Sequence, residues 1–209
     1  MELDEVKRRM SDGGLYVCNS PELFAEQARC RDVLDAYNAL PFGCMQEREE
    51  LLSRMVAEVG EGCLIEPPLH ANWGGANVHL GDRVYANMGL TLVDDADIFI
   101  EDDVMIGPNV TICTAAHPVS PRLRVQGLQY NKPVRICAGA WLGAGCVVLP
   151  GVTVGAGSVV GVGSVVTRDV PAGVVAVGSP CRVLREISEK DDRFYDGGKP
   201  IDDVIKPLG

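Results

Sequence analysis

Large aliphatic residues recur every six positions in the second half of the chain. They open six consecutive hexads, at Ile136, Leu142, Val148, Val154, Val160 and Val166. Four positions after each comes a second, mostly smaller residue, in the set Ala140, Cys146, Val152, Ser158, Ser164 and Val170. A period of six excludes an amphipathic helix, whose apolar residues recur every three or four positions. It is a signature of a parallel β-helix, because ordinary hairpins do not keep one register over six units.

Glycine follows three of these aliphatic positions, at Gly143, Gly155 and Gly161. Glycine tolerates backbone angles that other residues avoid, and corners between short strands often demand such angles. We therefore expect each hexad to be a short strand followed by a tight turn, and the fold to be mainly β.

The same period extends toward the N-terminus, with two breaks. Earlier hexads begin at Leu80, Ala86, Leu92, Ile100, Ile106 and Ile112. Two extra residues separate the third of these hexads from the fourth. Residues 113–135 then lack the period and contain His117-Pro118 and a polar run. Long loops on rigid scaffolds tend to carry function, so we expect residues 113–135 to form a functional loop ejected from the β-helix.

Residues 1–62 lack the period and look helical. Ser20 suits an N-cap and Pro21 suits the first helical position, which predicts a helix over residues 21–40. A second apolar pattern predicts a helix over about residues 46–59. We expect these helices to form a cap on the β-helix.

The β-helix should occupy residues 63–181, with its repeats starting near residue 80. The period loosens toward residue 181, and we expect a short C-terminal helix from Arg182 to Lys190. The tail that follows, residues 191–209, is charged and contains Gly and Pro. The chain is thus expected to be one β-helical domain between a helical cap, 1–62, and a small appendage, 182–209.

Composition and charge narrow the possible partners. Of the 209 residues 46% are hydrophobic, which is enough for a substantial core, yet no apolar stretch approaches the ~20 residues of a membrane span. The first twenty residues are rich in charge, which argues against a signal peptide. A net charge of −10 opposes binding to nucleic acid. We expect a soluble, cytoplasmic protein that binds neither nucleic acid nor membrane.

The eight cysteines are scattered along the chain, without a C-x-x-C pair or a metal-ligand spacing. Small buried thiols are typical of proteins in a reducing compartment. We therefore expect neither disulfide bonds nor a bound metal.

Several motifs agree in order and spacing with those of a known family. They are Tyr85-Ala86-Asn87, Val93-Asp94-Asp95, Thr114-Ala115-Ala116-His117-Pro118, Lys132-Pro133-Val134, Ala140-Trp141-Leu142-Gly143 and Val177-Gly178-Ser179-Pro180-Cys181-Arg182-Val183. Across nearly the whole chain the sequence resembles the galactoside and maltose O-acetyltransferases, which are hexapeptide-repeat acyltransferases. The resemblance implies a left-handed parallel β-helix with about eighteen residues per turn. It also implies a homotrimer with active sites between subunits, which transfers an acetyl group from acetyl-CoA to a sugar hydroxyl.

His117 resembles the catalytic histidine of this family. Attack of an alcohol on a thioester needs a base that removes the hydroxyl proton, and histidine titrates in the useful range. We expect His117 to be the general base of a direct transfer within a ternary complex. An alternative is an acetyl-cysteine intermediate on Cys113, relayed through His117.

The resemblance also assigns the binding residues. The sugar acceptor is expected to contact Asn72, Tyr85, Asn87, Asp95 and Gln129. Coenzyme A is expected along Trp141, Ala144, Val162, Thr167, Arg168, Arg182 and Arg185. Cationic side chains suit its phosphates. The alternative for Arg182 and Arg185 is an ordinary charge pair on the surface of a helix.

The chain departs from the family at the acceptor side. Cys18 and Gln27 occupy positions where the galactoside enzymes have an aspartate and an arginine, which puts a galactoside acceptor in doubt. Asn72 replaces a small hydroxyl residue, and Gln129 stands where one family member has a methionine. The acceptor therefore remains open between maltose or glucose and a galactoside.

Other classes of protein are alternatives. A β-helical carbonic anhydrase needs three zinc-binding histidines, and the spacing of His70, His79 and His117 does not resemble that site. An acetyltransferase for an antibiotic or an amino sugar would keep the same kind of histidine. A structural solenoid without activity is the remaining possibility.

Overall fold

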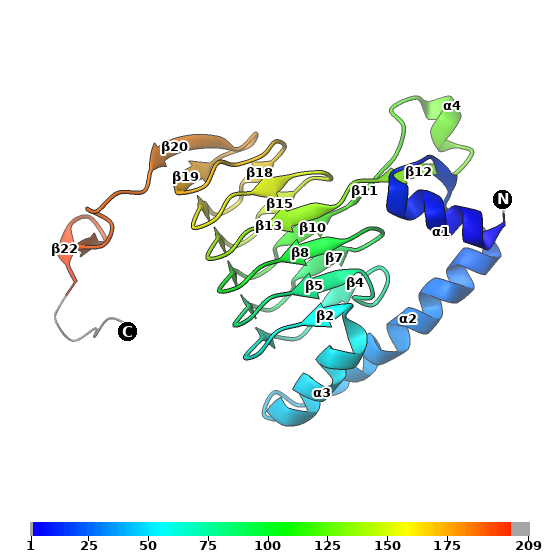
Figure 1. Cartoon of the computed structure of the whole chain (residues 1–209), viewed down its shortest axis with the longest axis horizontal. Helices are drawn as coiled ribbons and strands as arrows, with labels where there is room; N and C mark the ends of the chain where they lie inside the picture. The colour runs from blue at the N-terminus through cyan, green and yellow to red at the C-terminus, as the bar shows by residue number, and fades with distance from the viewer. Residues whose placement is uncertain (1, 202–209) are drawn as a thin grey trace.

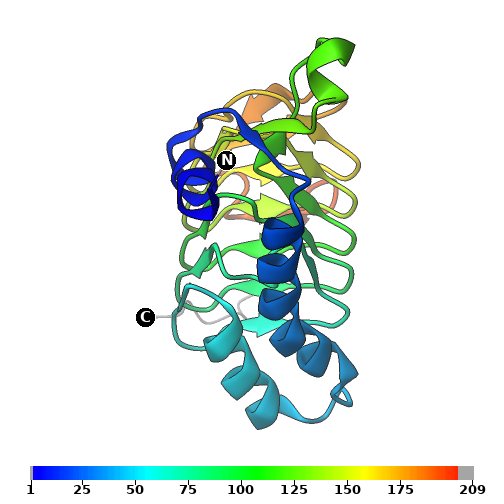
Figure 2. The same ribbon diagram turned by 90° about the vertical axis from the view of Figure 1, so that its right-hand side faces the viewer.

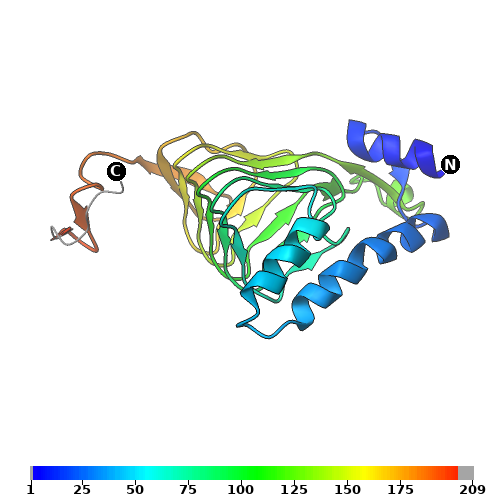
Figure 3. The same ribbon diagram turned by 60° about the horizontal axis from the view of Figure 1, so that its bottom comes forward.

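The computed structural model describes residues 2–201, which form a solenoid of short strands with helices at its first coil and along one side (Figure 1). The first three helices are α1 (Leu3–Asp12), α2 (Pro21–Ala39) and α3 (Met45–Met55). The strands that follow gather into three parallel sheets, which are the three sides of the solenoid (Figure 3). The mainly β, parallel β-helical fold expected from the six-residue period is confirmed.

Each side of the solenoid is named here by its first strand. The β2 side contains β2 (Glu58–Val59), β5 (Val78–Leu80), β8 (Ile98–Ile100), β13 (Val134–Ile136) and β16 (Thr153–Val154). The β3 side contains β3 (Leu64–Ile65), β6 (Tyr85–Ala86), β9 (Met105–Ile106), β14 (Trp141–Leu142), β17 (Val159–Val160) and β19 (Val174–Val177). The β4 side contains β4 (His70–Ala71), β7 (Thr91–Val93), β10 (Thr111–Cys113), β15 (Val147–Val148) and β18 (Val165–Val166).

Successive coils stack in a fixed register. Trp141 pairs with Val159, which is eighteen residues further on and equals three hexads. Thr111 pairs instead with Val147, thirty-six residues further on, because the ejected loop lies between them. The loop therefore replaces nothing in the solenoid: β10 and β15 remain direct neighbours.

The hexad positions predicted to be internal are internal. All six aliphatic residues that open the hexads from Ile136 to Val166 have no exposed surface, and the second set from Ala140 to Val170 is buried too. Burial of these aliphatic side chains is the main favourable term for such short strands.

The corner role expected of Gly143, Gly155 and Gly161 is wrong, because none of them has a positive φ. The corners with positive φ lie instead three positions after five of the six aliphatic residues, at Gly139, Gly145, Gly151, Gly157 and Gly163. The glycines directly after the strands have no positive φ, and they are needed because the coils approach closely. A Cβ on Gly155 would lie 2.4 Å from the backbone nitrogen of Ala172 in the next coil.

The prediction of a C-terminal helix over residues 182–190 is wrong. Arg182–Glu186 forms strand β20, which pairs antiparallel with β19. The reason is that β19 ends its sheet, and an open sheet edge offers unpaired N–H and C=O groups that a following strand can bind. Beyond β20 a small hairpin, β21 (Phe194–Tyr195) and β22 (Lys199–Pro200), stands apart from the solenoid (Figure 1).

The helical cap is confirmed for α2 and shorter than expected for α3. The Ser20 hydroxyl accepts a hydrogen bond from Leu23 N (3.2 Å), as an N-cap does. Helix α3 ends at Met55, and Glu58–Val59 already forms the first strand of the solenoid. The first coil thus begins before residue 63, and well before residue 80. No helix within residues 2–201 is both long and apolar enough to cross a membrane.

Helix α2 runs along the stacked coils and is tied to the first of them (Figure 2). The Tyr37 hydroxyl donates to the carbonyl oxygen of Ile65. The Asn38 amide donates to the carbonyl oxygen of Leu69 (2.8 Å) and accepts from its N–H (2.9 Å). These bonds fix the cap on the solenoid.

A buried carboxylate anchors the turn between β4 and β5. Asp94 is completely buried, and its two oxygens accept hydrogen bonds from Trp73 N (2.7 Å) and Gly75 N (3.0 Å). The same turn presses on α2, since a Cβ on Gly74 would lie 2.0 Å from the carbonyl oxygen of Cys30. The turn is thus held between the solenoid and α2.

The two glycine roles predict different costs for the same substitution. Gly157→Ala should lower the free energy of unfolding by about 1 kcal/mol, because its φ is +62° but a Cβ there meets no atom within 4 Å. Gly155→Ala should cost about 3 kcal/mol, because the next coil must move. Urea unfolding of both variants measures the difference, and equal costs would contradict the assignment of roles.

Asp94 predicts a pH-dependent stability. Burial raises its pKa from 3.8 to about 6, although three backbone N–H groups, those of Trp73, Asp94 itself and Gly75, oppose the rise. The stability that Asp94 contributes is therefore fully present below about pH 3.8 and is lost as the pH rises through about 6. Asparagine mimics the protonated carboxyl and does not titrate. From pH 4 to pH 7 the wild type should therefore lose up to about 3 kcal/mol of unfolding free energy relative to the Asp94→Asn variant. Denaturant unfolding of both proteins from pH 4 to pH 7 measures this difference in free energy. A difference that stays constant with pH would refute the prediction.

Candidate active site

The ejected loop carries its own small sheet. It contains β11 (Ala115–Ala116), α4 (Pro121–Arg124) and β12 (Leu128–Asn131), and β12 pairs antiparallel with both β11 and β1 (Tyr16–Val17) of the cap. Helix α4 stands out beyond the coils at the tip of the loop (Figure 1). The base of the loop is therefore held by three strands, two of its own and one from the cap.

His117 follows β11 directly and is exposed. Its Nδ1 lies 2.8 Å from the carbonyl oxygen of Leu128 in β12. A carbonyl oxygen can only accept, so Nδ1 carries the proton in this bond. Nε2 is therefore the ring nitrogen that can act as a base when the ring is neutral.

Three of the five candidate acceptor residues meet in one hydrogen-bonded group. The Asp95 carboxylate accepts from the Asn72 amide at Oδ2 (3.0 Å) and from the Gln129 amide at Oδ1 (3.1 Å). Trp73 Nε1 is a further donor at Oδ1 (3.4 Å). Asp95 is only 8% exposed, so these three neutral donors replace water around its carboxylate.

Sequence reasoning missed the support behind this group. The Tyr16 hydroxyl donates to Asn131 Oδ1 (3.2 Å), and the Gln129 amide donates to the Tyr16 oxygen. Asn131 Nδ2 in turn donates to the carbonyl oxygen of Asp95 (2.8 Å). Tyr16 and Asn131 are 115 residues apart in sequence, so no local pattern marks them as partners.

The other two candidate acceptor residues form a second group. The Tyr85 hydroxyl donates to Glu66 Oε1 (2.7 Å) and accepts from the Asn87 amide (3.0 Å). The hydrogen bond to Glu66 raises the pKa of Tyr85, so the hydroxyl keeps its proton. Asn87 thus offers an amide that is already oriented by its neighbours.

The two groups lie at opposite edges of the β4 side. Asn87 follows β6 at the corner where the chain enters this side, whereas Asp95 follows β7 at the corner where it leaves. His117 also lies beyond the leaving corner, past β10. One chain therefore brings Asn72, Asp95 and Gln129 together, but not with Tyr85 and Asn87.

Three candidate coenzyme A residues lie on neighbouring coils. Trp141 in β14 is 49% exposed, which is unusual for a tryptophan. Ala144 follows the same strand, and Val162 follows β17 in the next coil and is exposed as well. The N–H of Gly163 donates to the carbonyl oxygen of Ala144 (2.9 Å), which stacks these two corners on each other.

The three candidate coenzyme A arginines differ in whether an acidic side chain binds them. Arg168 and Arg182 line one small cavity of about 130 Å³, and the exposed Thr167 precedes Arg168. Arg185 instead makes a two-pronged ion pair with Asp191 (2.7 and 2.8 Å). Arg182 and Arg185 were both expected at the coenzyme A site, and they differ in their partners.

Cys113 lies in β10, four residues before His117, and is partly buried. Burial raises the pKa of its thiol, and the nearby Asp95 raises it further. A raised pKa disfavours the thiolate, which is the nucleophilic form. All eight cysteines are free thiols, and residues 2–201 contain no cluster of His, Cys, Asp and Glu that could hold a metal ion.

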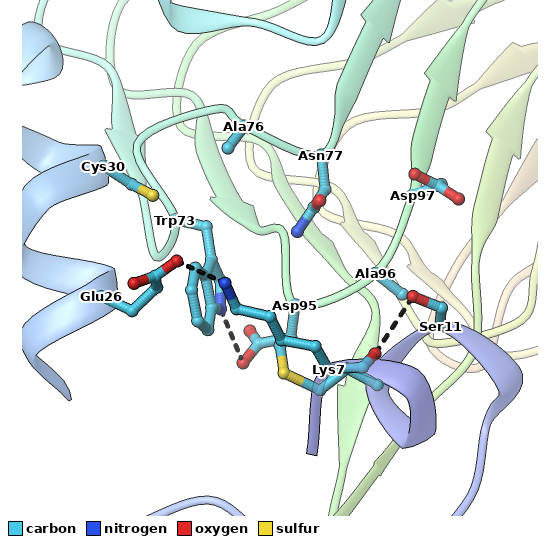
Figure 4. A pocket seen from close by; sticks show the side chains of 11 residues that line it. Lys7, Ser11, Glu26, Cys30, Trp73, Ala76, Asn77, Asp95, Ala96 and Asp97 are labelled. Carbon is cyan, nitrogen blue, oxygen red and sulfur yellow. Dashed lines mark hydrogen bonds and ion pairs between the residues drawn. The ribbon is translucent and has the colours of Figure 1, made fainter. Parts of the chain in front are cut away.

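A cavity of about 290 Å³ lies beside Asp95, under the helical cap (Figure 4). Its lining residues come from α1, α2 and the turns after β4 and β7. They are Lys7, Met10, Ser11, Glu26, Cys30, Trp73, Ala76, Asn77, Asp95, Ala96 and Asp97. Neither Cys18 nor Gln27, at which the sequence departs from the family, is among them.

Comparison with known proteins agrees with this geometry. Residues 9–60 match the family described as maltose acetyltransferase hexapeptide capping motif, and residues 133–168 match the bacterial transferase hexapeptide repeats. The galactoside O-acetyltransferase of Lactococcus lactis is 51% identical over 95% of this chain and 96% of its own length.

Solved structures show the same similarity. A galactoside acetyltransferase in complex with coenzyme A has a TM-score of 0.90 and 39% identity, covering 97% of this chain and 99% of its own. A maltose O-acetyltransferase from Clostridium difficile has a TM-score of 0.84 and 37% identity, covering 88% and 97%. This chain belongs to the family of galactoside and maltose O-acetyltransferases, which are acyltransferases built on hexapeptide repeats.

Proposed function

We propose that the protein transfers the acetyl group of acetyl-CoA to a hydroxyl of a sugar, with His117 as the general base. The observation that carries this proposal is the hydrogen bond between His117 Nδ1 and the Leu128 carbonyl oxygen. It fixes the tautomer in which Nε2 is the free base. The support for the donor and the acceptor comes from the relatives named above: one is solved with coenzyme A, and others are named for galactosides and maltose.

The reaction follows from this tautomer. Nε2 of His117 removes the proton of the sugar hydroxyl while the oxygen attacks the thioester carbon. A C–O bond forms, and the carbonyl oxygen becomes an oxyanion, which the Asn87 amide or backbone N–H groups stabilise. The intermediate then collapses with cleavage of the C–S bond. The leaving thiolate takes the proton back from the imidazolium, which yields coenzyme A and the acetylated sugar.

Direct transfer is preferred over an acetyl-cysteine intermediate. The covalent route needs a thiolate at Cys113, and burial opposes its formation. His117 also makes no hydrogen bond with Cys113: its Nδ1 is engaged by Leu128. A nucleophile and its base should lie within hydrogen-bond reach.

We further propose a homotrimer with the active sites between subunits. The two acceptor groups lie at opposite edges of the β4 side, so a partner subunit would have to unite them. The outward positions of the β3 side supply an apolar surface for such contact, since Met105 pairs with Trp141 and both are about half exposed. In this arrangement Asn72, Asp95 and His117 of one subunit would face Tyr85 and Asn87 of another.

The donor side would follow the β3 side and the last coils. Trp141 would pack on the pantetheine arm, with Ala144 and Val162 as close neighbours. Thr167, Arg168 and Arg182 would bind the phosphates through charge-assisted hydrogen bonds. Eight free thiols favour a reducing compartment, and we place the protein in the cytoplasm on that ground.

Replacement of His117 tests the role of the base. His117→Ala should lower turnover by ~10²–10⁴-fold and leave the affinity for coenzyme A unchanged, because the proton acceptor is lost but the donor site is not. Thiol release from acetyl-CoA, screened against glucose, maltose, galactosides, amino sugars and chloramphenicol, measures turnover. Near-wild-type turnover of His117→Ala would remove the residue from this role, and full activity of Cys113→Ser would dispose of the covalent route.

The different partners of the three arginines predict that their replacement changes the KM for acetyl-CoA to different extents. Arg168→Gln and Arg182→Gln should each raise the KM for acetyl-CoA by about tenfold and leave the KM for the sugar unchanged. Arg185→Gln should change it less than threefold, because Asp191 already engages that guanidinium. Initial rates at varied acetyl-CoA decide this; an equal or larger effect at Arg185 would reverse the assignment.

A further inference from the structure

Strand β12 is longer than β11, the strand beside it in the ejected loop. β12 has four residues and β11 only two. The last pair in their register joins Ala116 to Tyr130. The first two residues of β12, Leu128 and Gln129, therefore extend past the end of β11. On that side they face the continuation of the chain, which is His117-Pro118.

Alternate residues along β12 direct their backbone groups to opposite neighbours. On the β11 edge, Lys132 N donates to the carbonyl oxygen of Thr114 (2.8 Å). On the β1 edge, the carbonyl oxygen of Gly127 accepts from Cys18 N (2.9 Å). Hydrogen-bonded pairs recur at every second residue of an antiparallel ladder. The backbone carbonyl of Leu128 therefore faces the β11 edge and not β1.

The next hydrogen bond on the β11 edge would need an N–H from residue 118. The pair that follows Ala116 and Tyr130 in this register joins residue 118 to Leu128. That residue is Pro118, which has no N–H and cannot donate to a ladder. The Leu128 carbonyl oxygen accepts from His117 Nδ1 instead (2.8 Å).

β12 offers this carbonyl from a fixed position. Its other edge pairs with β1, and the side chains of Gln129 and Asn131 are buried. The Gln129 amide donates to the Tyr16 hydroxyl and to the Asp95 carboxylate. The Asn131 amide donates to the carbonyl oxygen of Asp95 (2.8 Å). Because β12 is held in this way, the place of the His117 ring depends on which donor the Leu128 carbonyl accepts from.

A backbone N–H at position 118 would compete with the imidazole of His117. Both donors would have to reach the Leu128 carbonyl from the β11 edge, because β1 covers the other edge. A ladder bond at this position would also continue β11 as an extended strand. Side chains of a strand stand out of the plane of the sheet, whereas its carbonyl groups lie in that plane. The ring would then leave the carbonyl.

We propose that Pro118 is a positioning residue for the general base. Because it brings no N–H to the ladder between β11 and β12, it leaves the Leu128 carbonyl oxygen free to accept from His117 Nδ1. This bond keeps the proton on Nδ1 and leaves Nε2 as the base. The inference rests on the proposed function and adds to it a residue that acts only through His117.

The first test observes the tautomer directly. With nitrogen-15-labelled histidine, the neutral His117 ring should show a protonated Nδ1 and an unprotonated Nε2 at about pH 8.5, above the ordinary pKa of histidine. His117→Gln identifies its signals. In Pro118→Ala the ring should exchange between both tautomers, and the new amide at position 118 should be protected from hydrogen exchange. An unchanged tautomer or a freely exchanging amide would overturn the proposal.

The second test measures turnover. Pro118→Ala should lower kcat about tenfold and leave the KM for acetyl-CoA unchanged, because the base is misoriented but the donor site is intact. Pro121→Ala is the matched control. Pro121 lies in the same loop and is exposed, but it opens α4, where an N–H has no partner in the helix anyway. An equal loss of kcat in both variants would assign the effect to loop stiffness and overturn the proposal.

The two tests separate this inference from the proposed function. A tautomer that changes in Pro118→Ala, in a protein without acetyl transfer to any sugar, would refute the proposed function and leave the positioning of His117. Turnover that is lost in His117→Ala but kept in Pro118→Ala, together with the wild-type tautomer, would refute the role of Pro118 and leave the function.

Discussion

The stacking of one coil on the next is the constraint on which the rest of the structure depends. Most strands have only two or three residues, so no strand is stable by itself, and each gains its hydrogen bonds only from the coils above and below. The register leaves no freedom within a side: Ile112 pairs with Val148 even though a whole loop separates them. An insertion can therefore occur only at a corner. The loop that carries His117 leaves at such a corner, directly after β10.

The same constraint explains which parts of the fold were predictable. The period predicted the buried positions of the coils, because identical positions stack and share one environment. The period also extends further toward the N-terminus than we expected. Val59, Ile65 and Ala71 are six residues apart and lie in the three strands of the first coil. The closing strand β20 could not be foreseen, because its five exposed residues carry no apolar pattern and its partner is an open sheet edge.

The sequence names candidate site residues, but it does not predict the contacts among them. Motifs shared with the family indicated His117 and Asp95, which both lie where the six-residue period is interrupted. The bonds that orient them join distant segments: Leu128 to His117 across the loop, and Tyr16 to Asn131 across most of the chain. The first pair exists only after the loop has folded and the second only after the cap has packed on the loop, so no spacing in the sequence encodes them. The role of Gly155 was likewise not predictable, because its close approach to the next coil depends on how the coils stack.

The Asp95 carboxylate connects the ejected loop with the turn after β4. Within residues 2–201 it has no ion-pair partner, and its side-chain donors are two amides and an indole, all neutral. These donors come from the turn after β4 and from β12, so one buried carboxylate holds the two segments together. Because the three donors replace water around Asp95, the loss of any one of them would leave part of a buried charge without a partner.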